Sequence, residues 1–367
     1  MTARTLRVLM TADPVGGVWA YALELIRGLA RLDVEVTLAT MGRALNAAQS
    51  RSIGELPHVT LSEGEFALEW MQDPWRDVDA AGEWLLDLER RTSPDVVHVN
   101  GYAHAALPFG VPVVAVAHSC VCTWHRAVHG SDPGPEWDVY RQRVARGLTA
   151  AGAVVGPTRA ILRAILEAYR IDRPGQVIAN ACDATRWPRA DKEPFVLGAG
   201  RLGDRAKGLT ELDACAARAR WPIYVAGEAR APSEDTDVEA RTVTLLGELS
   251  EEDLAGWMSR ASIYALPARY EPFGLSTVEA ALSGCALVLG NIETLREVWA
   301  DTAVYVPPGD ARALAAALDM LAADPLRRRA LAASSRKRAL ELTPARMAKQ
   351  YHALYCQLAG RSQEECA

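Results

Sequence analysis

Short apolar runs alternate with amphipathic stretches along almost the whole chain. The run Leu6–Met10 has the length and composition of a short buried strand, and a turn with two glycines follows it. From Val18 to Leu29 the apolar residues recur at spacings of three and four, which is the period of an amphipathic helix. The beginning of the chain therefore predicts a strand, a turn and a helix in succession.

The same alternation predicts a series of further strands. In the first half of the chain they are Val34–Ala39, Val59–Leu61, Val96–Val99, Val113–Val116, Ala153–Val155 and Val177–Ile178. In the second half they are Phe195–Leu197, Ile223–Val225, Val243–Leu246, Ile263–Leu266, Ala286–Leu289 and Ala303–Val306. Helical patterns such as Arg159–Tyr169 separate most of these strands. Strands that alternate with helices predict parallel sheets with crossover connections.

The length of the chain predicts two domains. Its 367 residues compare with roughly 100–200 residues in a typical domain. The charged, proline-bearing stretch Asp183–Pro194 has the composition of a domain boundary. We therefore expect an α/β protein of two Rossmann-like, doubly wound parallel-sheet domains that face each other across a cleft, with ligands at the carboxyl ends of the strands.

Charge and hydropathy exclude some classes of protein. The chain carries 40 Lys and Arg against 46 Asp and Glu, a net charge of −6, and nothing in this balance indicates a nucleic-acid-binding surface. No uncharged apolar run reaches the ~18 residues of a membrane-spanning helix. The N-terminal apolar stretch is too short for a signal peptide. We therefore expect a cytoplasmic protein without an integral membrane span.

Two local basic runs, Arg327–Arg329 and Arg336–Arg338, lie in a helical stretch near the end of the chain. Such runs usually form a solvated helix face, and we expect that here. A peripheral contact with a membrane surface is the alternative that this pattern leaves open.

One stretch is rich in residues that bind metals. It contains His118, Cys120, Cys122, His125 and His129. A zinc site is one interpretation, but the cysteines form a C-x-C pair and no second ligand pair follows. We favour a loop that leaves a strand end and carries one functional histidine. The seven cysteines of the chain show no regular spacing, so we expect reduced thiols.

Two glycine-bearing loops follow predicted strands. Gly16 and Gly17 lie between the first strand and the first helix, where a bare backbone and free N–H groups suit an anion. Arg201 and Lys207 lie on the loop after Phe195–Leu197, where two cations suit a departing diphosphate. Each loop has an alternative interpretation. The two glycines would serve only the geometry of the turn, and the two cations would be ordinary exposed side chains of a loop. The dinucleotide fingerprint G-x-G-x-x-G is absent.

The most informative segment is ALPARYEPFGLSTVEAALSG. Glu271 and Glu279 are eight positions apart and flank the predicted start of a helix. The N–H groups of Phe273, Gly274 and Leu275 would lie free at that helix N-terminus, where they suit sugar hydroxyls or phosphate oxygens. Ordinary helix capping by the two carboxylates is the alternative.

These motifs resemble a known family. E-P-F-G-L-x-x-x-E resembles the E-x7-E signature of retaining glycosyltransferases of the GT-B fold, in particular glycosyltransferase family 4. GGVWAYALEL resembles the N-terminal glycine loop of that family, and GRLGDRAKG resembles its G-R-L-x-x-x-K-G segment. VIANACD resembles its hinge, and AVYVPPGD resembles its late strand and turn. The resemblance extends over nearly the whole chain.

The resemblance implies roles for the candidate residues. Arg201 and Lys207 would hold the donor diphosphate, which Gly17 and Gly16 would also approach. His118 would lie beside the transferred sugar.

The resemblance assigns the remaining donor contacts to the segment between the two glutamates. Glu271 would hydrogen-bond the donor sugar ring, and Glu279 would bind the nucleotide ribose. The backbone of Phe273, Gly274 and Leu275 would support the sugar and the phosphates.

The resemblance also divides the chain. Residues 1–185 would form the acceptor-side domain, residues 186–344 the nucleotide-sugar donor domain, and residues 345–367 a helix that crosses back to the first domain. The implied reaction moves a sugar from a nucleoside-diphosphate sugar to an acceptor hydroxyl with retention, by a front-face mechanism without a cofactor or metal. The D-x-D triplets at 77–79 and 235–237 are interpreted as chance.

Other functions remain open at this point. A nucleotide-sugar epimerase or a glycoside phosphorylase uses the same fold. A non-catalytic nucleotide-sugar sensor would keep the nucleotide contacts alone. A NAD-dependent dehydrogenase is disfavoured because the dinucleotide fingerprint is missing.

Overall fold

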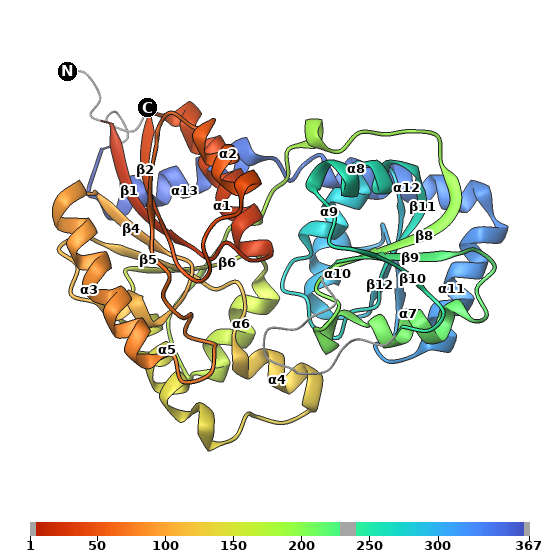
Figure 1. Ribbon diagram of the computed structural model, residues 1–367, viewed down its shortest axis with the longest axis horizontal. Coiled ribbons are helices and arrows are strands. Elements are labelled where there is room, and N and C mark those ends of the chain that lie inside the picture. Colours follow the sequence, from red (N-terminus) through yellow and green to blue (C-terminus); the bar gives the residue numbers. More distant parts are fainter. Residues whose placement is uncertain (1–4, 228–239, 363–367) are drawn as a thin grey trace. The chain divides into compact units, whose positions relative to one another are not determined.

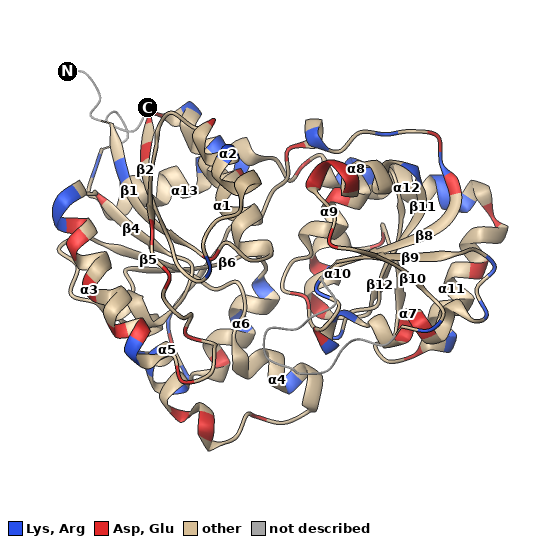
Figure 2. Ribbon diagram, viewed as in Figure 1, with Lys and Arg blue, Asp and Glu red and all other residues tan. Residues whose placement is uncertain are grey.

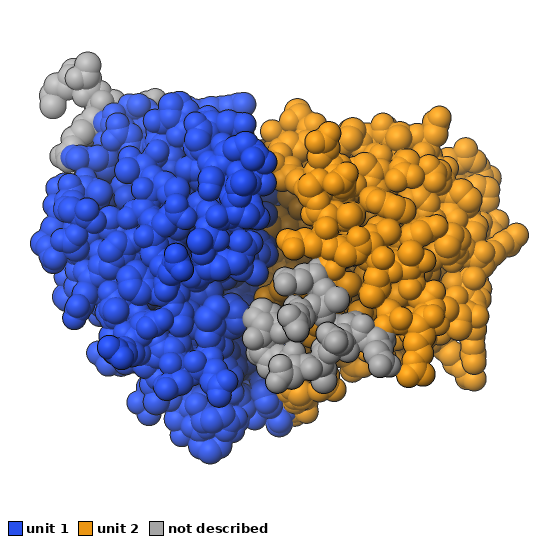
Figure 3. Space-filling model, viewed as in Figure 1, with its two compact units in different colours: residues 1–126, 131–181, 344–367 blue, residues 127–130, 182–343 orange. Residues whose placement is uncertain are grey.

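The computed structural model describes residues 5–227 and 240–362 and divides into two compact units (Figures 1 and 3). Unit 1 holds residues 1–126, 131–181 and 344–367, and unit 2 holds residues 127–130 and 182–343. Each unit contains one parallel sheet with helices packed around it. The predicted fold class, two α/β domains with doubly wound parallel sheets, is confirmed.

The sheet of unit 1 has seven strands in the order β3-β2-β1-β4-β5-β6-β7. The strands are β1 (Leu6–Ala12), β2 (Val34–Thr40), β3 (Val59–Glu63), β4 (Val96–Val99), β5 (Val113–Val116), β6 (Ala153–Gly156) and β7 (Gln176–Val177). All neighbours pair in parallel. The strand order reverses between β1 and β4, and in open sheets of this kind ligands bind beyond the carboxyl ends of the strands at that point.

The helices of unit 1 are α1 (Gly17–Leu29), α2 (Ala47–Gly54), α3 (Trp75–Thr92), α4 (Val121–His129), α5 (Asp138–Ala150), α6 (Arg159–Ala168) and α13 (Pro344–Leu358). The end of α4, from residue 127, falls in unit 2. Helix α13 comes from the end of the chain and packs against α1, and Figure 1 shows it among the N-terminal elements. A Cβ atom at Gly28 would lie 2.6 Å from the Pro344 carbonyl oxygen and 2.7 Å from the Ala348 Cβ. Only a residue without a side chain permits this close approach.

The sheet of unit 2 has six strands in the order β10-β9-β8-β11-β12-β13. The strands are β8 (Glu193–Ala199), β9 (Ile223–Ala226), β10 (Thr244–Gly247), β11 (Ala261–Leu266), β12 (Ala286–Gly290) and β13 (Val304–Val306). All neighbours again pair in parallel. Here the strand order reverses between β8 and β11. The second sheet therefore also has a reversal point, and in open sheets of this kind ligands bind beyond the carboxyl ends of the strands there.

The helices of unit 2 are α7 (Leu209–Ala216), α8 (Glu251–Arg260), α9 (Leu275–Leu282), α10 (Glu293–Trp299), α11 (Ala311–Ala323) and α12 (Pro325–Ala339). Ser250 caps α8 by accepting a hydrogen bond from the Asp253 N–H at 3.1 Å. The first turn of α8 carries three acidic residues, Glu251, Glu252 and Asp253 (Figure 2). Their negative charges stabilise the helix by interacting with the positive end of its dipole.

The basic runs differ in part from the expected solvated face. Arg327, Arg329 and Lys337 are exposed. Arg336 Nε, however, donates to the Leu282 carbonyl oxygen at 3.1 Å, where α9 ends. Arg338 Nη2 donates to the Glu297 carbonyl oxygen in the last turn of α10 at 3.0 Å. These arginines satisfy carbonyl groups that a helix C-terminus leaves unpaired, so the expectation was wrong for these two side chains.

The cysteines and the hydropathy follow the remaining expectations only in part. Five cysteines are free and buried: Cys120, Cys122, Cys182, Cys215 and Cys285. Cys356 in α13 is disulfide-bonded, so the expectation of thiols throughout was wrong there. Within residues 5–227 and 240–362, no helix is both long enough and apolar enough to cross a membrane.

Candidate active site

In unit 2 the candidate residues gather where the strand order reverses. Lys207 follows β8 and Glu271 follows β11, which are adjacent strands of the sheet. Lys207 Nζ lies 2.8 Å from Glu271 Oε2, and the two side chains are 16% and 15% exposed. The structure therefore brings together two predicted residues that are 64 positions apart in the sequence.

The loop after β8 has a defined conformation that presents Lys207. The side chain of Asp204 caps the short 3-10 turn Arg205–Lys207 by accepting from the Ala206 N–H at 2.9 Å. Gly208 follows with a positive φ of 77°. A Cβ at this position would lie 2.7 Å from the Pro267 carbonyl oxygen. A glycine is required because the backbone both turns through the left-handed region and touches the neighbouring loop.

Three contacts tie the loop after β11 to its surroundings. The Arg269 N–H donates to the Ala206 carbonyl oxygen at 2.8 Å. Arg269 Nη2 lies 2.6 Å from Glu211 Oε1 on α7, and this glutamate is only 9% exposed. Thr294 Oγ1 on α10 donates to the Glu271 carbonyl oxygen at 2.6 Å. These contacts therefore hold together the two loops that carry Lys207 and Glu271.

Helix α9 begins directly after Glu271 and offers backbone donors. Gly274, with φ of 88°, precedes its first residue Leu275 and makes no side-chain cap. Hydrogen bonds within the described part of the chain leave the N–H groups of Gly274 and Leu275 without an acceptor. The Phe273 N–H lies 3.5 Å from Glu271 Oε1, a marginal contact. These donors and the positive end of the helix dipole suit phosphate or sugar oxygens.

Tyr264 lies beneath the same edge of the sheet. Its hydroxyl donates to the Ala199 carbonyl oxygen at the end of β8 at 3.0 Å. Burial raises the pKa of this phenol, and the nearby carboxylates of Glu279 and Glu271 raise the pKa further. Glu279 itself is half-buried on α9.

Arg201 is the most open of the candidate cations. Its side chain is 52% exposed, and Nη2 lies 3.5 Å from Asp204 Oδ2. The structure places it on the same loop as Lys207, six positions earlier in the chain. Its partner Asp204 is only 12% exposed, so the loop holds the carboxylate while the guanidinium extends toward solvent.

In unit 1 the remaining candidates lie at the carboxyl ends of β1 and β5, on either side of β4. Gly16 precedes α1 with φ of 76°, and a Cβ there would meet no atom within 4 Å. Gly17 is the first residue of α1, and both glycines are exposed. His118 follows β5, and its ring makes an edge contact with Tyr21 of α1 at 4.5 Å between centroids.

His118 is held by a residue that the sequence did not single out. Its Nε2 lies 2.8 Å from Oδ1 of Asn100, which follows β4. The same oxygen lies 3.2 Å from Nε2 of the fully buried His98. Burial lowers the pKa of His98 to about 4. Burial, with His98 nearby, lowers the pKa of His118 to about 3. Both imidazoles are therefore neutral near pH 7.

The other metal-ligand types of this stretch do not gather around His118. His125 Nδ1 contacts the Ser131 carbonyl oxygen at 2.9 Å, and Cys120 Sγ contacts Thr123 Oγ1 at 3.2 Å. Among the described residues, no group of three or more His, Cys, Asp or Glu side chains could hold a metal. The triplet 77–79 lies in α3, and the triplet 235–237 lies outside the described residues.

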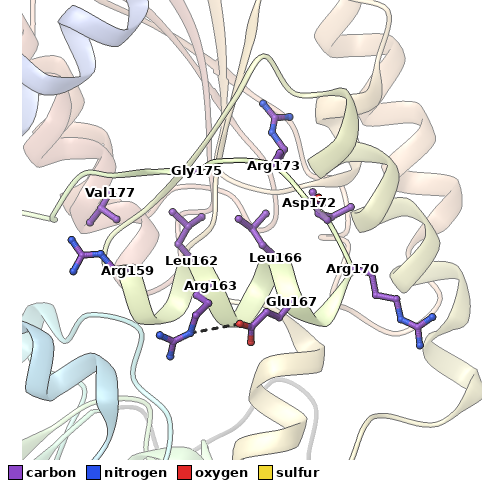
Figure 4. A pocket seen from close by; sticks show the side chains of 11 residues that line it. Arg159, Leu162, Arg163, Leu166, Glu167, Arg170, Asp172, Arg173, Gly175 and Val177 are labelled. Carbon is purple, nitrogen blue, oxygen red and sulfur yellow. Dashed lines mark ion pairs between the residues drawn. The ribbon is translucent and has the colours of Figure 1, made fainter.

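A pocket of about 570 Å³ lies elsewhere in unit 1, between α6 and the edge strand β7 (Figure 4). Leu162, Leu166 and Val177 form apolar parts of its lining, and Arg170 and Arg173 lie at its margin. Arg173 Nη1 donates to the Ala151 carbonyl oxygen at 2.6 Å, a contact that secures the end of α5. No candidate site residue lines this pocket.

Comparison with known families bears on both units. The family Glycosyltransferase Family 4 matches residues 15–186, and the family Glycosyl transferases group 1 matches residues 193–324. The chain belongs to glycosyltransferase family 4. The glycine loop and His118 of this family 4 chain fall within the first match, and Lys207, Glu271 and Glu279 fall within the second.

Individual relatives agree with this assignment. Glycogen synthase of Mycobacterium tuberculosis is 31% identical over 289 residues, which are 68% of this chain and 66% of the relative. The chain thus spans just under two thirds of that relative's length. Sucrose-phosphate synthase from Thermosynechococcus elongatus superimposes with a TM-score of 0.80 at 21% identity over 97% of this chain and 100% of the other.

A second solved structure has the same fold with a nucleotide sugar bound. The protein HepE of Anabaena, determined in complex with UDP-glucose, superimposes on the family 4 chain with a TM-score of 0.74. It is 16% identical, and the match covers 96% of this chain and 100% of HepE. At this identity the likeness shows the fold alone.

The sequence missed several residues that position the site. Asn100, Tyr264, Thr294 and the pair of Arg269 with Glu211 contact candidate residues or their loops. None belongs to a spaced motif. For Asn100 and Tyr264 the available signal was a position directly after or within a predicted strand, because parallel strands bring such positions to one edge.

Proposed function

We propose that this chain is a retaining glycosyltransferase that moves a sugar from a nucleoside-diphosphate sugar to an acceptor hydroxyl, without a metal. The observation that supports it most is the contact of Lys207 with Glu271 beside the open N–H groups of α9. A cation, a carboxylate and backbone donors then meet at the ligand-binding edge of the second sheet. These are the groups that a diphosphate joined to a sugar requires.

Each candidate site residue of unit 2 has a role in the proposal. Lys207 and the exposed Arg201 bind the diphosphate and stabilise the negative charge that grows on it as it leaves. Glu271 accepts hydrogen bonds from hydroxyls of the sugar ring. The N–H groups of Gly274 and Leu275 donate to oxygens of the sugar and the phosphates. Phe273 belongs to the same backbone segment.

The remaining roles concern the nucleotide and the transferred group. Glu279 accepts from the ribose hydroxyls of the nucleotide. Gly16 and Gly17 let the backbone of unit 1 approach the diphosphate, because neither has a side chain and a Cβ at Gly16 would meet no atom within 4 Å. His118 lies beside the transferred sugar. Residues 1–185 bind the acceptor, and residues 186–344 bind the donor.

The proposed chemistry balances without a protein base. The acceptor oxygen forms a bond to the anomeric carbon on the face from which the diphosphate departs. The bond between that carbon and the diphosphate oxygen breaks, and its electron pair stays on the phosphate. The departing phosphate oxygen takes the proton of the acceptor hydroxyl. The anomeric configuration is therefore retained.

Nucleotide binding gives the first test. Unfolding temperatures are measured with UDP, GDP, ADP and NAD, each at saturating concentration. A ligand present at about 100 times its dissociation constant adds about 2.7 kcal/mol of stability, which corresponds to roughly 5–10 °C for a domain of this size. We expect one nucleoside diphosphate to stabilise the protein and NAD to have no effect. A shift with NAD alone would contradict the proposal.

Product analysis separates transfer from other uses of the same ligand. The stabilising nucleotide is supplied as its sugar conjugate, beginning with UDP-glucose, which is bound by HepE, together with a panel of hydroxyl-bearing acceptors. Transfer requires a new glycoside and one free nucleoside diphosphate for each turnover. A new nucleotide sugar formed without an acceptor would indicate an epimerase. Release of a sugar phosphate that depends on inorganic phosphate would indicate a phosphorylase. Binding without turnover would indicate a sensor.

A further inference from the structure

Asn100 lies at the carboxyl edge of the first sheet and has a fixed amide orientation. It directly follows β4, between β1 and β5. Its Nδ2 donates to the Thr11 carbonyl oxygen at 2.7 Å, and its backbone N–H donates to Thr11 Oγ1 at 2.9 Å. A carbonyl oxygen only accepts hydrogen bonds, so the NH₂ group of the amide must face Thr11. Oδ1 therefore points away from Thr11.

The amide oxygen fixes the protons on two histidines. Oδ1 lies 2.8 Å from His118 Nε2 and 3.2 Å from His98 Nε2. An amide oxygen cannot donate, so each Nε2 must carry a proton. A neutral imidazole has one proton, and burial keeps both rings neutral by lowering the pKa of each. Nδ1 of each ring is therefore a hydrogen-bond acceptor.

The second nitrogen of His98 is satisfied from the end of the chain. Its Nδ1 lies 2.5 Å from the hydroxyl of Tyr355 on α13, which donates to it. Both side chains are fully buried. Every hydrogen bond from Thr11 through Asn100 and His98 to Tyr355 then has one donor and one acceptor, which supports this single arrangement of protons.

The corresponding nitrogen of His118 differs. Across residues 5–227 and 240–362, no group forms a hydrogen bond with His118 Nδ1. The ring cannot easily turn over, because Tyr21 packs against it at 4.5 Å and Asn100 holds Nε2. His118 thus presents one acceptor atom of fixed position and fixed protonation.

We infer that Asn100 is a positioning residue that holds His118 in its Nε2–H form, so that Nδ1 accepts a hydrogen bond from a hydroxyl of the transferred sugar. The inference rests on the proposed function, in which His118 lies beside that sugar. A hydroxyl donates to Nδ1. A carboxylate or a fluorine in its place cannot donate and is disfavoured. The site therefore selects a sugar with a hydroxyl at this position.

The protonation of His118 can be measured on the free protein. Histidine labelled with ¹⁵N is incorporated, and ring nitrogen shifts are recorded near pH 7.5, with His118 assigned through the variant His118→Gln. We expect a protonated Nε2 and an unprotonated Nδ1 in the unsubstituted protein. A proton on Nδ1, or a mixture of both forms, would overturn the inference even if Asn100→Ala fails to fold. This result does not depend on any nucleotide sugar.

Binding measurements connect the protonation state to the substrate. In Asn100→Ala the His118 ring loses its fixed form, and we expect UDP-glucose to bind about three- to tenfold more weakly, the effect of one hydrogen bond. Tyr355→Phe is the matched control. It removes a buried hydrogen bond from the same network but leaves Asn100 anchored to Thr11. It should lower the unfolding temperature while His118 protonation and UDP-glucose affinity stay unchanged. Equal loss of affinity in both variants would show a merely structural role.

Fluorinated donors identify the hydroxyl. Monofluoro analogues of UDP-glucose replace one hydroxyl at a time with an atom that cannot donate. One position should bind several-fold more weakly to the unsubstituted protein, and His118→Ala should remove this difference. The absence of any such position would refute the specificity. If UDP-glucose itself fails to bind, the proposed donor is wrong, and the ring nitrogen shifts still decide the role of Asn100.

Discussion

Lys207 Nζ and Glu271 Oε2 lie 2.8 Å apart and connect the loops after β8 and β11. The contact holds the ammonium group at the carboxyl edge of the second sheet in the free protein. A side chain that is already ordered loses less conformational freedom when a ligand binds. The ion pair also places a cation and a carboxylate within reach of one ligand, one for a diphosphate and one for sugar hydroxyls.

Removal of the loop cations should impair transfer. In the proposed mechanism, Lys207→Ala and Arg201→Ala each remove a charge that would stabilise the departing diphosphate, and we expect each to lower kcat by about 10²–10³. Arg205→Ala is the matched control, because Arg205 is an exposed cation of the same 3-10 turn. Its rate should stay within about twofold of the unsubstituted enzyme, since a screened surface charge contributes little. Near-normal turnover in both test variants would remove the diphosphate assignment.

Gly274→Ala should disturb the start of α9. The residue has φ of 88°, and an added Cβ would lie 2.9 Å from Thr277 Oγ1 and 3.3 Å from Leu295 Cδ2. We expect the free energy of unfolding to fall by more than about 1 kcal/mol and transfer to fall with it. Gly256→Ala in α8 is the control, since a Cβ there meets nothing within 4 Å. Helix propensity predicts up to about 1 kcal/mol of added stability at that position. Denaturant titrations of both variants measure the contrast.

Acid should destabilise the protein through His98. Its pKa is lowered by burial from 6.5 to about 4 in the folded state. Between these two values the unfolded chain binds a proton that the folded protein does not, so stability is full above pH 6.5 and is lost as the pH falls toward 4. The contribution reaches about 3 kcal/mol. Urea titrations from pH 7.5 to 4.5 should show a smaller loss in His98→Gln. An unchanged pH dependence in that variant would contradict the assignment.

Chelation tests the expected independence from metals. The proposed mechanism places the charge of the diphosphate on Lys207, Arg201 and backbone donors. We therefore expect full transfer activity in excess EDTA, measured by release of the nucleoside diphosphate. Loss of activity in EDTA, restored by a divalent cation, would require a metal in the mechanism.

Much of the fold follows from the sequence because the strands are short, apolar and rich in β-branched residues. Runs such as Val113–Val116 are buried on both faces of a parallel sheet, and their composition marks them clearly. Strand positions were predicted within a few residues, and the alternation with helices predicted parallel pairing. Local pattern and tertiary environment agree for these elements.

Other features depend on contacts that no local pattern encodes. Asn100 reaches His118 because β4 and β5 are neighbours, and the strand order is decided by packing over the whole unit. Arg336 and Arg338 look like surface charges in sequence, yet they pair with carbonyl groups of α9 and α10, which are 54 and 41 positions away. The motif glutamates and loop cations stay predictions as site residues.

The configuration of the product tests the central claim most directly. The protein is incubated with an α-linked nucleoside-diphosphate sugar, beginning with UDP-glucose, and the acceptor that gives turnover. The anomeric coupling of the new glycoside is then read by proton NMR. The account predicts an α-glycoside and one free nucleoside diphosphate for each sugar transferred. A β-glycoside would contradict the front-face mechanism, and the absence of transfer from any nucleotide sugar that binds would contradict the proposed function.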